Sequence, residues 1–410
     1  MYGFSTRAIH RRPTKKDVHG ALRAPVYDSV AFEHDDAQSL KLSFEGKKPG
    51  HLYSRITNPT VEDFEQRIRE ISGGLAVVAV SSGMAAISNT IMALAESGAN
   101  IVTTRKIFGN TLALFEKTLQ PWGLETRCVS MADTEAIEKA IDENTRALFL
   151  ESITNPHLEV ADIEAIGRVA QRFGVPLVLD NTVLTPYLFD SKAAGVNIEI
   201  LSSTKAISGG GTSVGGLIID NGNFDWRKAQ KLAERAGQFG RMAFIAALRA
   251  DVYRNTGSCL APHNAYLQSL GLETLSLRLD KTCANTQLIA EFLEGHQKVS
   301  AVQYPGLPGS PYHQISSRLF KGKYGGILTF DLPSQESCFA CMDRLKLIRR
   351  ATNINDNKTL ILHPSSTIFA EYGEVEKKAM GLRSSMLRLS VGIEDHEDLL
   401  EDLGEGLAAL

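Results

Sequence analysis

Between residues 75 and 219 the sequence alternates short apolar runs with segments of helical periodicity. This alternation is typical of a mostly parallel β-sheet with helices on both faces. In such α/β folds ligands bind beyond the carboxyl ends of the strands, so the residues after each strand are the candidate functional residues. The predicted strands cover residues 76–81, 99–103, 125–129, 146–150, 175–180, 198–203 and 214–219, and the predicted helices cover residues 84–96, 109–120, 133–141, 161–173 and 189–194.

One lysine follows the sixth predicted strand. The stretch from Ile198 to Ile219 reads IEILSSTKAISGGGTSVGGLII, which predicts a strand, a turn that carries Lys205, and a second strand. A lysine at the end of a buried strand loses hydration, which lowers its pKa and makes its amine a usable nucleophile or base. From these residues alone, a solvated lysine in a surface hairpin is the alternative interpretation.

Two other strand ends suit a flat, anionic ligand. The residues Ser82-Gly83-Met84 begin the helix after the first strand, and free N–H groups at a helix N-terminus bind anions. Phe108 follows the second strand, where its ring is placed to stack on a flat ligand. An ordinary helix cap and a core phenylalanine are the alternatives at these two positions.

Polar residues follow two further strands. Asn155 offers an amide, although Asn155-Pro156 is also typical of a turn. Asp180 ends a buried strand, where a carboxylate is costly unless paired; it is either a cap or the counter-charge of a protonated ring nitrogen. A lysine, an aspartate, an aromatic ring, an amide and phosphate donors are what a pyridine aldehyde phosphate requires. The phosphate donors would be Ser82, Gly83, Met84, Ser202 and Thr204.

The two flanks of the chain differ from this central region. Residues 1–60 contain several prolines and scattered charges, so we expect an arm that is disordered or packs on another surface. Tyr53 and Arg55 precede a helix cap and suit a phosphate contact. From residue 259 onward, blocks of helices and short strands predict a smaller α+β domain. Arg388 lies there in a strand-like run, either pointing into a cavity or exposed on an edge strand.

The composition argues against several other classes of protein. A net charge of −3 provides no basic field for nucleic acid, and the apolar runs are shorter than the roughly 20 residues of a membrane span. The N-terminus lacks the apolar segment of a signal peptide. Five cysteines do not form a disulfide framework, and we interpret Cys338 and Cys341 as packing residues of a helix, not as metal ligands. We therefore expect a soluble, cytoplasmic globular protein without a metal site.

Six motifs occur in order along the chain: YSRITNPT, SSGMAAI, ESITNP, LVLDNT, SSTK and MLRLSVGIED. They resemble the Cys/Met-metabolism PLP-dependent enzymes, the gamma family of fold type I, over nearly the whole chain, and most of all the O-acetylhomoserine sulfhydrylases. The resemblance implies pyridoxal 5'-phosphate as cofactor and at least a homodimer, with a homotetramer as the usual assembly. It implies an N-terminal arm over residues 1–60 that reaches the neighbouring subunit, a PLP-binding domain over 61–258 and a C-terminal domain over 259–410.

The resemblance also implies a role for each matching residue. Lys205 would bind the cofactor aldehyde and then move protons at Cα and Cβ of the substrate. Asp180, with Thr182 close by, would pair with the pyridine nitrogen, and Asn155 would lie at the 3-hydroxyl of the ring. Arg388, helped by Asn353, would bind the substrate carboxylate, and Tyr53 and Arg55 would reach the cofactor phosphate in the neighbouring subunit.

Two positions depart from the family pattern. Phe108 replaces the usual tyrosine, which keeps the stacking but removes a hydroxyl often assigned to proton transfer to the leaving group. Ile368-Phe369 replaces the common Thr-His near the carboxylate site. Because acetate leaves with little help, we expect γ-replacement of O-acetyl-L-homoserine by sulfide or a small thiol, giving L-homocysteine or methionine and acetate. The alternatives are cystathionine gamma-synthase, O-succinylhomoserine sulfhydrylase, a methionine or cystathionine gamma-lyase, and a non-catalytic binding protein of the same fold.

Overall fold

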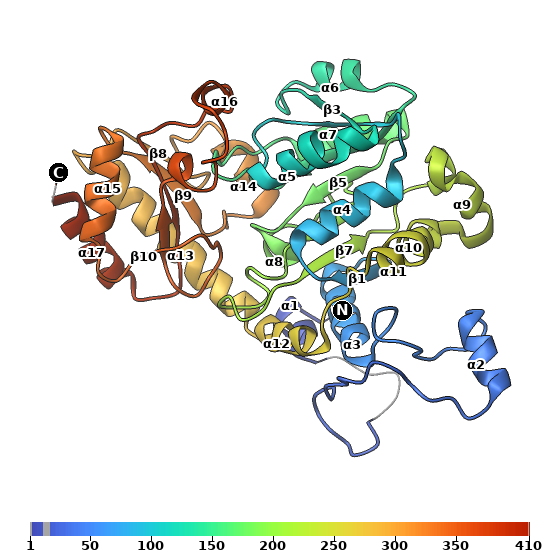
Figure 1. Cartoon of the computed structure of the whole chain (residues 1–410). Coiled ribbons are helices and arrows are strands. Elements are labelled where there is room, and N and C mark those ends of the chain that lie inside the picture. Colours follow the sequence, from blue (N-terminus) through green and yellow to red (C-terminus); the bar gives the residue numbers. More distant parts are fainter. Residues whose placement is uncertain (1, 11–16, 409) are drawn as a thin grey trace.

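Two β-sheets organise the chain (Figure 1). The structure is a computed structural model that describes residues 2–10, 17–408 and 410. The larger sheet lies within residues 61–258 and the smaller one within residues 259–410, in line with the α/β and α+β regions expected from the sequence. The domain boundaries themselves stay a prediction. No helix of the described part is both long and apolar enough to cross a membrane.

The larger sheet has seven strands in the order β1-β7-β6-β5-β4-β2-β3. Strand β7 runs antiparallel to both of its neighbours, and the other pairs are parallel, as predicted. The strands β6 and β7 are the two that flank the lysine turn. The strands are β1 (Ala76–Val80), β2 (Asn100–Thr103), β3 (Glu125–Cys128), β4 (Thr145–Glu151), β5 (Leu177–Asp180), β6 (Ile198–Leu201) and β7 (Gly216–Asp220).

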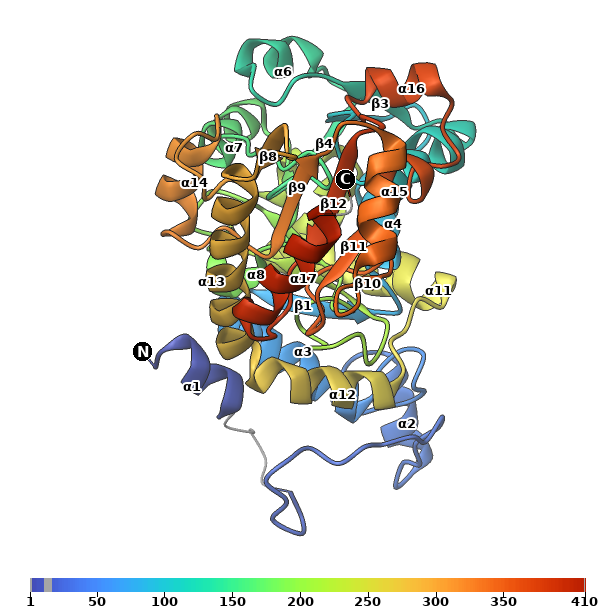
Figure 2. The same ribbon diagram turned by 90° about the vertical axis from the view of Figure 1, so that its left-hand side faces the viewer.

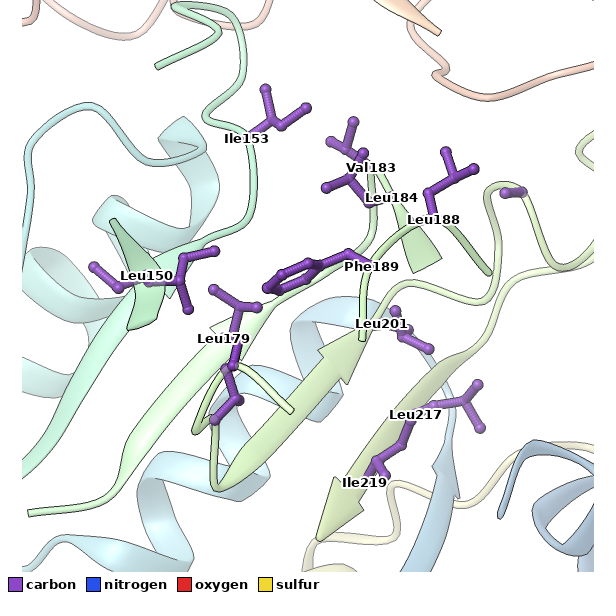
Figure 3. Close-up of a cluster of buried hydrophobic side chains, with 14 of the residues drawn as sticks. Leu150, Ile153, Leu179, Val183, Leu184, Leu188, Phe189, Leu201, Leu217 and Ile219 are labelled. Atoms are coloured by element: carbon purple, nitrogen blue, oxygen red, sulfur yellow. The ribbon is translucent and has the colours of Figure 1, made fainter. Parts of the chain in front are cut away.

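Both faces of this sheet are buried. Successive residues of a strand point to opposite sides of the sheet, so each strand contributes side chains to two apolar clusters. In β5, Leu177 and Leu179 belong to one apolar cluster and Val178 belongs to the other. Figure 3 shows the first cluster, where Leu150, Leu179 and Leu201 of neighbouring strands lie beside Phe189 and Leu188. Burial on both faces explains why these strands read as continuous apolar runs.

Helices cover the two faces of the larger sheet (Figure 1). The predicted helix over residues 189–194 is wrong: this segment is a turn, closed by the side chain of Asp190 and by Gly195 at φ 87°, and a short helix lies just before it. The predicted helix over residues 109–120 begins as α-helix but continues as a π-helical turn over Leu114–Leu119. The helices are α3 (Pro59–Ser72), α4 (Gly83–Leu94), α5 (Gly109–Ala113), α6 (Thr134–Ala140), α7 (Ile163–Phe173), α8 (Thr185–Leu188), α9 (Ala233–Phe239), α10 (Ala243–Ala247) and α11 (Arg254–Thr256).

The smaller sheet has five strands in the order β10-β11-β12-β9-β8. Figure 2 shows α13, α15 and α17 lying over it, and all three contribute to one apolar cluster with the strands. Cys338 and Cys341 of α15 are buried in this cluster, as expected of packing residues. The elements are α12 (Pro262–Glu273), α13 (Leu275–Glu294), β8 (Ala301–Gln303), α14 (His313–Phe320), β9 (Ile327–Asp331), α15 (Gln335–Arg344), β10 (Arg349–Arg350), β11 (Leu360–Leu362), α16 (Glu374–Ala379), β12 (Met386–Ser390) and α17 (His396–Ala408).

The N-terminal region contains two short helices that the sequence did not predict, α1 (Phe4–Ile9) and α2 (Ala37–Phe44). Helix α1 packs on the body of the protein, with Ala8 buried and the ring of Phe4 4.9 Å from the ring of Tyr187. Figure 1 shows α2 and the segments beside it extending away from the two sheets. Several apolar side chains of this extension are exposed, namely Tyr27, Val30, Leu40, Phe44 and Tyr53.

Candidate active site

A cavity of about 310 Å³ opens where strands β4, β5 and β6 end, and strand β12 of the smaller sheet reaches it from the other side. Every residue predicted from a strand end lines this cavity. The side chains expected to bind a carboxylate line it too, which brings residues from the two sheets to one place. The predicted residues in the lining are Ser82, Gly83, Met84, Phe108, Asn155, Asp180, Thr182, Ser202, Thr204, Lys205, Asn353 and Arg388.

Lys205 lies in the turn that follows β6, with its amine in the cavity. Its Nζ donates a hydrogen bond to Oδ1 of Asn353 at 2.7 Å, and Nδ2 of Asn353 donates to Asp356 at 3.0 Å. Burial, followed by the positive charge of Arg388, lowers the pKa of Lys205 to about 8. The unprotonated fraction of the amine near neutral pH is therefore larger than for an ordinary lysine, which makes it a better nucleophile or base.

Asp180 is the last residue of β5, and its carboxylate lies at the floor of the cavity. The backbone N–H of Thr182 donates to Asp180 Oδ1 at 2.9 Å, and the Thr182 hydroxyl accepts from the backbone N–H of Ser202 at 2.8 Å. These bonds fix the carboxylate relative to the next strand. Burial raises the pKa of Asp180, so a cationic group placed against it would hold it in its charged form.

The N-terminus of α4 forms a second wall of the cavity. The hydroxyl of Ser82 caps the helix by accepting from the backbone N–H of Ala85 at 3.0 Å. A Cβ at Gly83 would lie 2.7 Å from Cβ of Ser202, so only glycine lets these two segments approach so closely. The helix N-terminus and the serine hydroxyls form a donor set that suits a phosphate. The hydroxyl of Thr204, in contrast, already bonds to both backbone groups of Gly215.

Arg388 lies on β12, a central strand of the smaller sheet, and its side chain is 3% exposed, so the alternative of a surface arginine is wrong. Its Nη1 donates to Asn155 Oδ1 and its Nη2 to the carbonyl of Asn353, both at 3.1 Å. Its Nε has no partner among the described residues. Burial lowers the pKa of Arg388 to about 10. A buried cation with a free N–H beside a cavity is suited to bind a carboxylate.

Two predicted residues do not line the cavity of this chain. Tyr53 is 42% exposed, and Arg55 donates to the backbone carbonyl of Arg254 while its guanidinium lies 5.4 Å from the ring of Tyr53. Both precede the cap residue Asn58, whose side chain accepts from the first backbone N–H groups of α3.

Sequence reasoning missed several residues of the cavity. The most informative is Glu151, which ends β4 and pairs in register with Asp180. Its Oε1 accepts from the backbone N–H of Phe108 at 2.7 Å and its Oε2 accepts from that of Asn155 at 3.3 Å. Its position at the end of a predicted strand was the sequence signal that could have identified it. The remaining residues of the lining are Ile87, Thr111, Ile153, Val183, Val214, Thr352, Ile354 and Ile368.

The cavity suits pyridoxal phosphate by its own chemistry. It combines an amine of lowered pKa, a buried carboxylate, an aromatic ring and a helix N-terminus whose Gly83 packs closely against Ser202. Arg388 lines the same cavity and its Nε has no partner among the described residues, so its guanidinium retains capacity to bind the carboxylate of an amino acid. These groups would hold the ring nitrogen, the aldehyde carbon and the phosphate of the cofactor at separate points.

Comparisons with known proteins agree with this chemistry. The O-acetyl-L-homoserine sulfhydrylase of Corynebacterium glutamicum is 37% identical over 100% of this chain and 98% of its own. A solved Campylobacter jejuni structure that contains N'-pyridoxyl-lysine-5'-monophosphate has a TM-score of 0.95 at 32% identity, covering 99% of this chain and 100% of its own. The structure of an O-acetylhomoserine sulfhydrylase from Wolinella succinogenes is 51% identical, with a TM-score of 0.78, over 86% of this chain and 97% of its own.

The sequence profile of one protein family, described as Cys/Met metabolism PLP-dependent enzyme, matches residues 5–408. That match covers all the cavity residues named above. With the fold-type I architecture of its structural neighbours, it confirms both the predicted fold class and the predicted cofactor. The chain belongs to the Cys/Met metabolism family of PLP-dependent enzymes.

Proposed function

We propose that this enzyme is an O-acetyl-L-homoserine sulfhydrylase, which replaces the acetate of O-acetyl-L-homoserine with sulfide or a small thiol and releases L-homocysteine or methionine. The observation that carries the proposal is the pairing, in one cavity, of Lys205 and Asp180 with a buried Arg388. The relatives named as sulfhydrylases that match the full chain support the same reaction.

The roles of the residues follow from their places in the cavity. Lys205 would hold the cofactor aldehyde, and its lowered pKa would let its amine take a proton from Cα of the substrate and return protons to the carbon chain. Asp180 would pair with the ring nitrogen in its protonated form, and Phe108, in the same lining, would supply an aromatic surface for the ring. The bound cofactor supplies an electron sink for the carbanion at Cα. Asn155 would contact the ring hydroxyl, and its Oδ1 accepts a hydrogen bond from Arg388, which positions that guanidinium.

The charges of the cavity favour a substrate whose ester group carries no charge. Among the described residues that line it, the cations are Lys205 and Arg388. Lys205 is committed to the cofactor, and Arg388 pairs with the α-carboxylate of the substrate. The rest of the lining is apolar, as at Ile153, Ile354 and Ile368, or polar without a positive charge. A succinyl carboxylate or a phosphate would have to be desolvated there without a partner cation, which is costly. An acetyl ester carries no such charge.

Sulfide-dependent formation of homocysteine from three esters tests the proposal. The acetyl, succinyl and phosphate esters of L-homoserine are compared as substrates at equal concentration, with L-methionine as a fourth compound. We expect kcat/KM to be highest for the acetyl ester by at least tenfold, since one unpaired charge costs more than 1.4 kcal/mol. A preference for the succinyl or phosphate ester, or faster breakdown of methionine in the absence of sulfide, would contradict it.

We also propose that Tyr53 and Arg55 bind the cofactor phosphate in the neighbouring subunit, which makes a homodimer the smallest active form and a homotetramer its expected assembly. The support is their position on the N-terminal extension, outside the cavity of their own chain, together with the exposed apolar side chains around them. Burying those apolar side chains between two subunits would stabilise the dimer.

All five cysteines are free thiols, as is common in the reducing cytoplasm, where we place the enzyme.

Subunit mixing tests this arrangement. Arg55→Ala and Lys205→Ala chains are each expected to be inactive alone. A mixed dimer would contain one site in which both residues are intact, so activity should return after the two variants are unfolded and refolded together. Mixed dimers that form, as shown by tags on each variant, but stay inactive would contradict the shared site.

A further inference from the structure

Asn355 has an unusual backbone conformation at the junction of the two sheets. It lies in the connection between β10 and β11, its side chain is 4% exposed, and its φ is +51°. This left-handed region disfavours residues other than glycine, although asparagine tolerates it better than most. A strained, buried, polar residue at such a place points to a task for its side chain.

The contacts of Asn355 join the two sheets. Its backbone N–H donates to the hydroxyl of Ser390, the last residue of β12, at 2.9 Å. Its side-chain Nδ2 donates to the backbone carbonyls of Thr182 and Val183, at 3.3 and 3.0 Å. Thr182 and Val183 lie two and three residues after Asp180, the last residue of β5. One residue therefore connects the loop behind the carboxylate of the larger sheet to the strand that carries Arg388.

The neighbours of Asn355 in the chain act in the cavity. Two residues earlier, Asn353 accepts a hydrogen bond from Lys205 and offers its carbonyl to Arg388. The next residue, Asp356, accepts a hydrogen bond from the Asn353 amide. The short segment 353–356 thus contacts Lys205 and Arg388 directly, while the amide of Asn355 ties it to the loop after β5.

We propose that Asn355 is a positioning residue that sets the distance between the carboxylate-binding pair, Asn353 and Arg388, and the cofactor-binding residues Asp180 and Thr182. The inference rests on the proposed roles of these four residues. The cofactor would be held by the larger sheet, and the substrate carboxylate by the smaller one. Without the amide of Asn355, the segment 353–356 loses its hydrogen bonds to the loop after β5, and the distance between the two halves of the site is less closely fixed for the bound amino acid.

The test uses the variant Asn355→Gly, because glycine adopts the positive φ without strain but lacks the amide. The matched control is Asn285→Ala. Asn285 is also buried, and its amide also donates to two backbone carbonyls, those of Gly392 and Glu394, but all of these lie in the C-terminal part of the chain. The control therefore loses the same kind of hydrogen bonds without separating the two sheets.

Three quantities are measured on the full-length enzyme: the dissociation constant of pyridoxal phosphate, the dissociation constant of L-norvaline from the loaded enzyme by its spectral change, and the KM of O-acetyl-L-homoserine. L-Norvaline has no leaving group, so its binding tests the positioning even if the proposed reaction is wrong. For Asn355→Gly we expect the norvaline constant and KM to rise about tenfold, which corresponds to about 1.4 kcal/mol and is within what the loss of two hydrogen bonds allows. Cofactor affinity should be unchanged.

Asn285→Ala should lower the melting temperature while leaving all three constants at their wild-type values. The inference is overturned if Asn355→Gly binds norvaline as the wild type does, because the backbone turn alone would then be sufficient. It is also overturned if Asn285→Ala shows the same tenfold loss, or if Asn355→Gly weakens the cofactor as much as the amino acid. Either result would show a general loss of structure, not a loss of spacing.

Discussion

Replacement of Glu199 by glutamine should make the protein more stable at pH 8, with an effect that diminishes toward pH 4.5. Glu199 lies in the middle of β6 and is 1% exposed. Its carboxyl group accepts hydrogen bonds from the Asn181 amide at 2.8 Å and from the Ser191 hydroxyl at 2.6 Å, but no cation pairs with it in the described structure. Burial raises its pKa from 4.5 to about 7.

The sign of the effect follows from proton binding. Between pH 4.5 and 7 the folded protein keeps Glu199 protonated while the unfolded chain loses the proton, so the stability that protonation provides is complete below pH 4.5 and is lost as pH rises through 7. At 1.36 kcal/mol per pKa unit, the raised pKa corresponds to about 3 kcal/mol. Glutamine resembles the protonated acid and does not ionise, so Glu199→Gln avoids this loss.

The assay is the melting temperature of wild type and variant at several pH values from 4.5 to 8.5. A chain of 410 residues has an unfolding entropy of about 0.9 kcal/mol/K, so 3 kcal/mol corresponds to a difference of about 4 °C at pH 8. Asp220, whose pKa burial also raises to about 7, contributes the same pH dependence to both proteins and cancels in the difference. A difference that is constant with pH, or a variant less stable than wild type at pH 8, would refute the reasoning.

Three further changes test the site. Arg388→Lys cannot reproduce the hydrogen bonds to both Asn155 and Asn353, so KM for the amino-acid substrate should rise about 10- to 100-fold with a smaller change in kcat. An unchanged KM would argue against a carboxylate site at Arg388. Phe108→Tyr should raise the rate of methionine breakdown relative to turnover of O-acetylhomoserine, because a hydroxyl is restored near the leaving group; steady-state rates with both substrates decide this. Gly83→Ala should weaken cofactor binding about tenfold in an absorbance titration, because the Cβ of the new alanine would lie 2.7 Å from Cβ of Ser202. Wild-type affinity would show that the helix N-terminus does not bind the phosphate.

Most residues of the site that the sequence predicts share one property: each lies at the end of a strand or shortly after it. Lys205, Asp180 and Asn155 are found in this way because parallel strands bring their carboxyl ends to one edge, and a strand signal of apolar residues is local. Arg388 belongs to a different sheet, so its place in the cavity depends on how the two sheets pack. A local pattern contains no information on that packing, and the residue alone left a surface position open.

Other features depend on contacts across long sequence distances and were out of reach for the same reason. The task of Asn355 becomes visible only when Thr182, more than a hundred positions earlier, lies against it. Helix α1 forms because Ala8 and Phe4 have a surface to pack on, not because the arm has a strong helical pattern. The sequence predicts a helix over residues 189–194, but Ser191 bonds to Glu199 and Gly195 turns the chain, which ends any helix there.

The central claim is that Lys205 is the one lysine that binds the aldehyde of pyridoxal phosphate. Borohydride reduction of the loaded enzyme, followed by proteolysis and mass spectrometry, fixes the cofactor on the residue to which it is bonded. We predict the phosphopyridoxyl group on the peptide that contains Lys205, and no such peptide after Lys205→Ala. A phosphopyridoxyl group on any other lysine, or an unmodified Lys205 in enzyme that shows the visible absorption of bound cofactor, would contradict the account.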